Sequence, residues 1–169
     1  MATDPATTFQ KDDPSLTPAQ LVTEGSPTQI RPFEEPDDAS VVALWKRVFA
    51  YPAPHNDPAR VIRDKLAVQR GLFFVALLGG ALVGTVMGGY DGHRGWVYSL
   101  AVAPQARGRG VGTALMRHVE RALAARGCPK VNPQLLESNA GAAEFYKKLG
   151  YAVEERVSMG KLLTPPSSG

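Results

Sequence analysis

The chain has 169 residues, of which 44% are hydrophobic and 21% are charged, which is ordinary for a globular protein. It has no run of about 18 apolar residues and no basic N-terminal segment followed by an apolar one, so we expect no membrane span, membrane partner or secretory signal. The single cysteine, Cys128, excludes an internal disulfide and fits a cytoplasmic protein, where it is either a small structural residue or a catalytic thiol.

Charge divides the chain unevenly. Residues 1–40 hold two basic and eight acidic residues, whereas residues 41–169 carry a net charge of +9. The first 28 residues are rich in Asp, Pro, Thr and Ser and predict an acidic, mostly flexible arm, and residues 164–169 predict a loose C-terminal tail. Between them, residues 29–163 predict a single domain.

The first half of this domain predicts a strand, two helices and three further strands. The two helices follow Asp37 and Asp57, residue types that are typical of helix starts, and carry apolar residues at helical spacing. Gly79 and Gly80 together are typical of a tight turn between two strands. The expected strands span residues 29–33, 72–78, 81–88 and 96–102.

The second half predicts a long helix, a strand, a short helix and two last strands. Apolar residues spaced by four, from Val111 to Leu123, mark the long helix, and Asn139 is a suitable first cap for the short one. The order β-αα-βββ-α-β-α-ββ is that of an α/β (α+β) protein with a mixed sheet. The helices are expected at about 110–126 and 140–149, and the strands at 131–136, 151–156 and 157–163.

A glycine-rich turn before the long helix carries the clearest chemical information. Gly108, Gly110 and Gly112 would let the backbone come close to a ligand, and the unpaired amides of the helix start would face it. Arg107 and Arg109 add positive charge. The turn is therefore suited to bind a pyrophosphate.

Two common phosphate-binding loops do not fit this spacing. The dinucleotide fingerprint needs Gly-x-Gly-x-x-Gly, but the last glycine is replaced by Thr113. No Gly-Lys-Ser/Thr sequence of the Walker A type is present. Taken alone, the turn could also be a purely structural connection between a strand and a helix.

The sequence resembles the GNAT (general N-acetyltransferase) superfamily in two motifs. Arg107-x-x-Gly110-x-Gly112 is similar to the pyrophosphate-binding signature of that family, and residues 139–151 are similar to its second cofactor segment. Residues 84–95 resemble the bacterial YpeA-like branch. The resemblance covers about residues 29–163 and implies a GNAT-like fold with a splay between the fourth and fifth strands.

The resemblance implies acetyl-CoA as the cofactor and no metal site. Backbone groups of the strand before the turn would pair with the pantetheine arm, as an added strand would. The amides of the turn would hold the pyrophosphate, and Asn139 would either contact the pantetheine or only cap its helix. The cofactor-binding residues are then Leu100, Ala101, Val102, Arg107, Gly108, Arg109, Gly110, Val111, Gly112, Thr113, Asn139 and Tyr146.

The resemblance further implies that a neutral amine attacks the thioester carbonyl directly. A backbone amide near Val102 would polarise this carbonyl. Tyr146 matches a tyrosine that protonates the departing thiolate, although an ordinary core tyrosine would explain it as well. The predicted strand 96–102 carries no Asp or Glu, so the general base must come from elsewhere. The first candidate is Glu137, and the others are Asp91, His93 and Tyr98.

The acceptor is expected to bind beside the two front helices. The residues predicted to contact it are Trp45, Tyr51, Asn56, Tyr90 and Asp91. Trp45 also lies on the apolar stripe of its helix and has a core position as its simpler interpretation. Pro133 and the pair Leu135-Leu136 depart from the family pattern around the fifth strand, where a proline removes a donor from the ladder.

Three functions are compatible with the sequence. The first is an N-acetyltransferase that moves an acetyl group from acetyl-CoA to a primary amine of a small molecule or a protein N-terminus. The second is a non-catalytic acyl-CoA-binding sensor on the same fold. The third is a basic nucleic-acid-binding module, but its basic residues would have to be gathered on one face, whereas here they are scattered, so no nucleic-acid partner is expected. A homodimer is expected by analogy with relatives.

Overall fold

The computed structural model describes residues 27–49, 56–136 and 139–163. The chain divides into two compact units, the first ending at Gln134 and the second spanning Leu135–Gly169, which we describe separately. In the described ranges, every helix is too short or too polar to cross a membrane. The predicted flexible arm and tail fall almost entirely outside these ranges.

The first unit is built on a five-stranded sheet in the order β1-β2-β3-β4-β5. Strands β1 to β4 are antiparallel neighbours, and β5 lies parallel to β4, as a mixed sheet requires. The strands are β1 (Gln29–Pro32), β2 (Phe73–Leu78), β3 (Ala81–Tyr90), β4 (Gly95–Val102) and β5 (Val131–Pro133).

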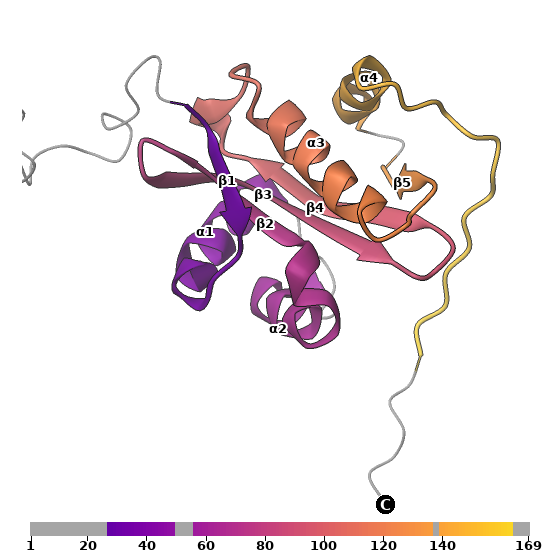
Figure 1. Ribbon diagram of the computed structural model, residues 1–169, viewed down its shortest axis with the longest axis horizontal. Helices are drawn as coiled ribbons and strands as arrows, with labels where there is room; N and C mark the ends of the chain where they lie inside the picture. The colour runs from indigo at the N-terminus through magenta and orange to yellow at the C-terminus, as the bar shows by residue number, and fades with distance from the viewer. Residues whose placement is uncertain (1–26, 50–55, 137–138, 164–169) are drawn as a thin grey trace, which may run out of the picture. The chain divides into compact units, whose positions relative to one another are not determined.

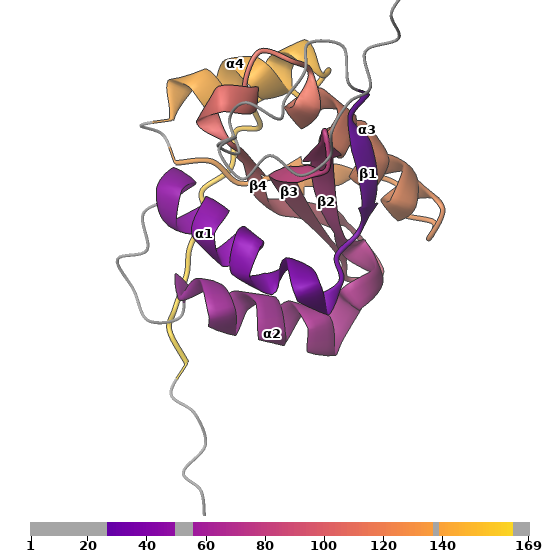
Figure 2. The same ribbon diagram turned by 90° about the vertical axis from the view of Figure 1, so that its left-hand side faces the viewer.

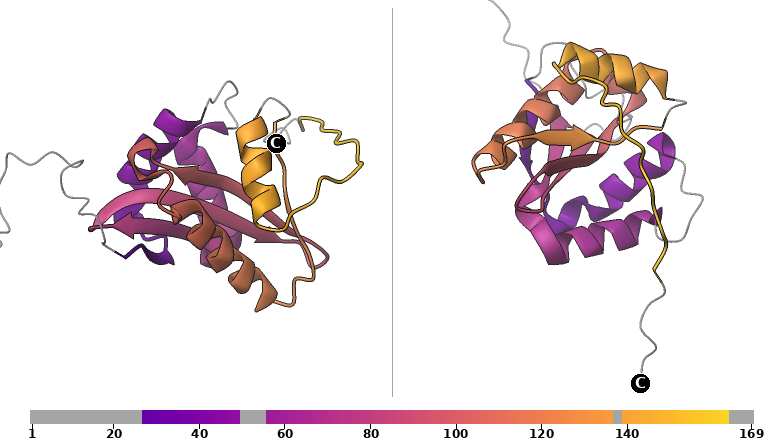
Figure 3. Two further views of the ribbon diagram at one scale, coloured as in Figure 1. Left: turned by 90° about the horizontal axis from the view of Figure 1, so that it is seen from above. Right: turned by 90° about the vertical axis from the view of Figure 1, so that its right-hand side faces the viewer.

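Helices cover both faces of this sheet. α1 (Asp38–Val48) and α2 (Pro58–Gln69) lie together on one face, and α3 (Val111–Ala124) crosses the other (Figures 1 and 2). The views in Figure 3 show the same two layers of helix on opposite sides of the strands. The α/β class and the mixed sheet predicted from the sequence are confirmed.

The two front helices begin in different ways. α2 starts as predicted, because the Asp57 carboxylate accepts a hydrogen bond from the Arg60 amide at 3.0 Å. Asp37 precedes α1 as predicted, but its side chain does not cap that helix. The carboxylate instead accepts two hydrogen bonds from the Arg31 guanidinium, at 2.6 and 2.8 Å, and one from the Glu34 amide. The Arg31 guanidinium lowers the pKa of Asp37 and ties β1 to the start of α1.

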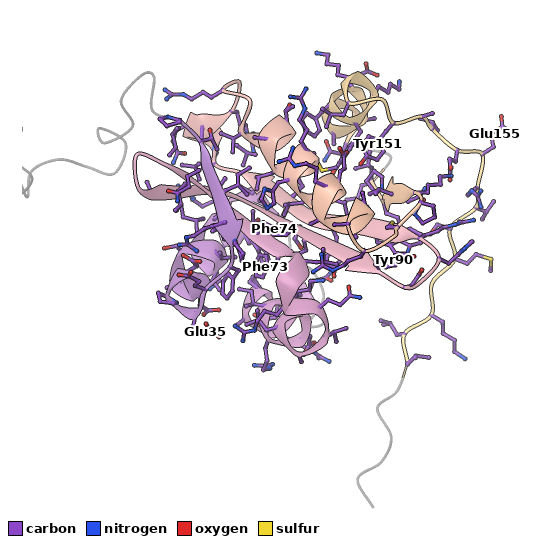
Figure 4. The ribbon with its side chains drawn as sticks, viewed as in Figure 1. Glu35, Phe73, Phe74, Tyr90, Tyr151 and Glu155 are labelled. Carbon is purple, nitrogen blue, oxygen red and sulfur yellow. The ribbon has the colours of Figure 1, made fainter. Side chains whose placement is uncertain are left out.

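Adjacent residues of β2 form the two halves of the core. Phe73 stacks on Phe33 with ring centroids 4.5 Å apart and lies 6.0 Å from the Trp45 ring of α1. Phe74 points to the other face and meets His118 of α3 edge to face at 4.5 Å (Figure 4). Because successive strand residues alternate between faces, one strand anchors both layers of helix.

A bulge in β4 is held by a buried polar chain. Residues Ser99 and Leu100 together oppose a single residue of β3, and Ser99 adopts a left-handed φ of 52°. The hydroxyl of Thr85, which is fully buried, donates to the Ser99 carbonyl at 3.0 Å and accepts the Trp45 indole N–H at 2.8 Å. α1 is thereby linked to the backbone of β4 through one side chain.

We expect Thr85→Val to lower the free energy of unfolding by about 1–2 kcal/mol, because it leaves the Trp45 N–H and the Ser99 carbonyl buried without partners. Urea unfolding followed by circular dichroism measures the effect. Thr85→Ser keeps both hydrogen bonds and removes only a methyl group, so it should cost less. A Thr85→Val protein as stable as the wild type would show that the buried chain does not stabilise the bulge.

β5 is shorter than the predicted strand 131–136. It pairs with β4 only from Gly95↔Val131 to Val97↔Pro133, although β4 continues to Val102. The ladder ends at Pro133 because proline has no amide hydrogen to donate. The two strands therefore separate where the sequence predicted a splay.

The second unit holds one helix, α4 (Ala140–Lys148). Asn139 caps it as predicted, since its side-chain oxygen accepts from the Ala142 amide at 3.2 Å. The two strands predicted at 151–156 and 157–163 are not found, because this stretch has no regular secondary structure. Its apolar residues, such as Val153 and Val157, are 79% and 90% exposed. Strand-like composition alone does not make a strand where no ladder partner is engaged.

Candidate functional site

The turn before α3 has a shape that glycine permits. Gly108 and Gly110 have φ of 74° and 76°, in the left-handed region that other residues rarely adopt. A Cβ atom at either position would meet no atom within 4 Å, and both residues are exposed. The glycines are thus required by the backbone conformation, and the outer surface of the turn is open to a ligand.

The backbone amides at the start of α3 are free to bind. Those of Val111, Gly112 and Thr113 make no hydrogen bond within the described part of the chain, and the helical ladder begins with the Ala114 amide donating to Gly110 at 2.9 Å. No side chain caps this helix. Unpaired amides and the helix dipole together attract an anion.

Two arginines flank this helix start. Arg107 and Arg109 are both exposed. The Arg107 Nε donates to the Val102 carbonyl at 3.3 Å, so its guanidinium bridges the turn and the end of β4. The positive charge predicted from the sequence therefore lies beside the free amides.

β4 has an unpaired edge next to this turn. Its partner on one side is β3, with Ala101 opposite Thr85 and Val102 opposite Gly84. On the other side, β5 reaches only to Val97, so among the described residues of the first unit no strand pairs with β4 from Tyr98 to Val102. An extended ligand could pair with this edge as an added strand. Every predicted cofactor contact from residue 100 to residue 113 lies on this edge or on the turn.

In the second unit, Tyr146 is 7% exposed and lies on α4. Its ring packs edge to face against Phe145, at 5.2 Å, and Tyr151, at 5.4 Å. Burial raises the pKa of Tyr146 to about 12, so the phenol keeps its proton at neutral and moderately alkaline pH. Such a group is suited to donate a proton rather than to accept one.

Asp91 holds the β3–β4 turn and is a poor general base. Its carboxylate accepts hydrogen bonds from the Arg94 and His93 amides, at 2.7 and 2.8 Å, and from the Trp96 indole at 3.2 Å. These donors lower the pKa of Asp91 to about 2. Asp91 therefore stabilises the β3–β4 turn and is a weak proton acceptor at neutral pH.

Two other residues that were predicted to contact the acceptor, Tyr90 and Trp45, have partners within the first unit. The Tyr90 hydroxyl donates to the carbonyls of Gly92, at 3.2 Å, and Gly127, at 3.3 Å (Figure 4). Gly127 follows the C-terminal end of α3, and a helix of 14 residues is about 20 Å long, so Tyr90 lies far from the glycine turn. Trp45 is 0% exposed and belongs to the core, which confirms its simpler interpretation.

Three predicted residues keep their status as predictions. Glu137 and Tyr51 lie outside the described residues. Asn56 is half-buried just before α2. Within 27–49, 56–136 and 139–163, no three His, Cys, Asp or Glu side chains gather as metal ligands would.

The sequence did not single out Lys65, which is 6% exposed on α2. Its ammonium donates to the Gly88 carbonyl and stands 5.4 Å from the centre of the Tyr98 ring on β4. Burial, with a smaller contribution from Arg126, lowers the pKa of Lys65 to about 8. In the sequence, its burial is indicated only by its position three residues after Ile62, on the apolar face of the helix.

Comparison with known proteins agrees with this geometry. The sequence pattern of the acetyltransferase (GNAT) family matches residues 39–151. Acetyltransferase YE1169 of Yersinia enterocolitica is 44% identical over 135 residues, which cover 80% of this chain and 95% of that protein.

Solved structures share the fold. Ard1 from Thermoplasma volcanium matches with a TM-score of 0.67 at 26% identity, over 75% of this chain and 84% of that one. The aminoglycoside N-acetyltransferase AAC(6')-Iy, solved in complex with CoA, matches with a TM-score of 0.67 at 22% identity, over 87% of this chain and 99% of that one. With a family pattern that spans most of its length and a close relative named as an acetyltransferase, this chain belongs to the acetyltransferase (GNAT) family, whose acetyl donor is acetyl-CoA.

Proposed function

We propose that this protein transfers the acetyl group of acetyl-CoA to a primary amine, of a small molecule or a protein N-terminus, by direct attack, and that it belongs to the YpeA-like branch that residues 84–95 resemble. The proposal rests on one observation, that two neighbouring parts of the first unit have backbone groups without partners in the described residues. The free amides of α3 suit a pyrophosphate, and the unpaired edge of β4 suits an extended arm that is attached to it.

In this proposal the protein acts mainly by positioning. Amides of Val111, Gly112 and Thr113 hold the phosphates, while Leu100 and Val102 offer backbone groups to the pantetheine arm. Fixing the thioester beside the amine supplies much of the rate enhancement, since a bimolecular step becomes effectively unimolecular. A backbone amide near Val102 would stabilise the oxyanion that develops on the thioester carbonyl.

Two proton transfers complete the reaction. The attacking amine loses a proton to a base, for which Glu137, His93 and a chain of water molecules are the first candidates. Asp91 and Tyr98 suit this role less, because the pKa of Asp91 is lowered to about 2 and burial raises the pKa of the Tyr98 phenol. The departing thiolate gains a proton, and Tyr146 is the proposed donor because its raised pKa keeps the phenol protonated.

We expect Tyr146→Phe to lower kcat for acetyl transfer by about 100-fold while the affinity for acetyl-CoA changes by less than about threefold. Release of the CoA thiol with a panel of amines measures the rate, and calorimetric titration measures the affinity. Tyr151→Phe removes a hydroxyl from the neighbouring ring and serves as the matched control.

The outcomes separate the candidate functions. Acetyl-CoA binding without transfer to any amine would favour the acyl-CoA sensor instead. A kcat that is unchanged in Tyr146→Phe would leave transfer intact but would remove Tyr146 from the mechanism. No acetyl-CoA binding by the wild-type protein would overturn the proposed function.

A further inference from the structure

Lys65 is a buried cation without an anionic partner. Only 6% of the residue is exposed, and in the described part of the chain the carbonyl of Gly88 is its one hydrogen-bond acceptor. No carboxylate within the described ranges forms an ion pair with it. Two of its three N–H groups therefore have no acceptor among the residues that the structure describes. Buried charges in proteins are normally paired, because a charge in a medium of low dielectric is costly unless an opposite charge compensates it.

The surroundings of Lys65 do not supply this compensation. The face of the Tyr98 ring, 5.4 Å from Nζ, gives a cation–π contact of modest strength. Arg126 contributes repulsion rather than attraction. The nearest amide side chain on α2, that of Gln69, is fully used, because it donates to the Tyr90 carbonyl at 2.8 Å and accepts from the Tyr90 amide at 3.1 Å.

This ammonium lies beside the part of the sheet that is open to ligands. Tyr98, which borders it, is 41% exposed and is the first residue of β4 beyond the end of β5. Gly88, which holds the ammonium, is paired with Val97, the residue just before Tyr98. The cation thus adjoins the start of the same strand edge on which the proposed function places the pantetheine arm.

We propose that Lys65 recognises a carboxylate on the acceptor, so that the preferred substrates are amines that also carry a carboxylic acid. This inference rests on the proposed function. A carboxylate is a monoanion, so one such group would give the single buried ammonium the opposite charge that it lacks among the described residues. A neutral acceptor of the same size would leave the cation unpaired, which is how a site built for a polar group rejects the analogue that lacks it.

The test compares acceptors that differ only in charge. The probes are ω-amino acids of three to seven carbons, their primary amides, the alkylamines of equal length and the ω-aminoalkylphosphonates, each assayed by release of the CoA thiol. For the wild-type protein we expect kcat/KM to be at least about tenfold higher for the best amino acid than for its amide. In Lys65→Met the ratio should fall to about 1, while Lys46→Met, a charge change on the exposed face of α1, should keep it.

A binding measurement on the wild-type protein requires neither catalytic turnover nor a folded variant. In the presence of CoA, the wild-type protein should be stabilised against heat by 6-aminohexanoate more than by 6-aminohexanamide. Equal rates and equal stabilisation by the acid and the amide would overturn the inference, and so would a preference for the phosphonate. Failure of acetyl-CoA to bind at all is a different result, because it refutes the proposed function itself.

Discussion

Gly110→Asp is expected to weaken acetyl-CoA binding by about 1,000-fold, which corresponds to about 4 kcal/mol. The aspartate would place a negative charge at the N-terminal end of α3, where the free amides otherwise attract the pyrophosphate. Its side chain would also cover amides that the glycine leaves open, since a Cβ at this position meets no other atom within 4 Å. Calorimetric titration of acetyl-CoA measures the loss.

The chain offers a closely matched control for this substitution. Gly80, in the β2–β3 turn, has φ of 81°, against 76° for Gly110, and a Cβ there also meets nothing within 4 Å. Gly80→Asp therefore imposes the same backbone strain and the same charge away from the proposed site. It should bind acetyl-CoA like the wild type. Equal affinity of Gly110→Asp and Gly80→Asp would mean that the amides of α3 do not hold the cofactor.

Lys65 is expected to make the stability of the protein rise between pH 8 and pH 10.5. The pKa of Lys65 is about 8 in the folded protein, against an ordinary value of 10.5. In that window the unfolded chain binds more protons than the folded one, so raising the pH favours folding, while below pH 8 the folded protein carries the full penalty of the buried charge. The full shift in pKa corresponds to about 3 kcal/mol.

Comparison with Lys65→Met isolates this contribution. Urea unfolding at several values of pH should show the variant at least as stable as the wild type at pH 7. Between pH 7 and pH 10.5, the free energy of unfolding of the wild type should rise by about 2–3 kcal/mol relative to that of the variant. Tyr98, which faces the ammonium, remains neutral over most of this window because burial raises its pKa. Lys46→Met should show no such trend. A difference that is independent of pH would mean that Lys65 titrates normally.

The parts of the fold that follow from local chemistry could be predicted from the sequence. The start of α2 at Asp57, the cap of α4 at Asn139 and the turn at Gly108 and Gly110 depend on residues close together in the chain. The strands predicted at 151–156 and 157–163 do not form, because a strand forms only when a partner edge is engaged, and the composition of a segment does not report that.

In the candidate site, too, local features could be predicted from the sequence and long-range contacts could not. The glycine turn before α3 is a continuous segment, so the spacing of its glycines in the sequence was informative. Asp91 and Tyr90 were predicted to contact the acceptor, but the sequence does not report that the folded chain uses both side chains for internal hydrogen bonds. Lys65 was not predicted as a site residue, because a lysine in a helix is ordinarily expected to be exposed. The helical pattern does not reveal that its ammonium reaches a strand carbonyl.

The hydrogen bond from Arg107 to the Val102 carbonyl has a consequence for the thermodynamics of ligand binding. Without a ligand, one acceptor at the end of β4 is already satisfied by the loop. A pantetheine arm that paired with Val102 would displace the guanidinium, so binding exchanges one hydrogen bond for another and gains only their difference. The guanidinium set free by this exchange would then be available to the phosphates, and the two halves of the cofactor would bind cooperatively, each making the contact of the other more favourable.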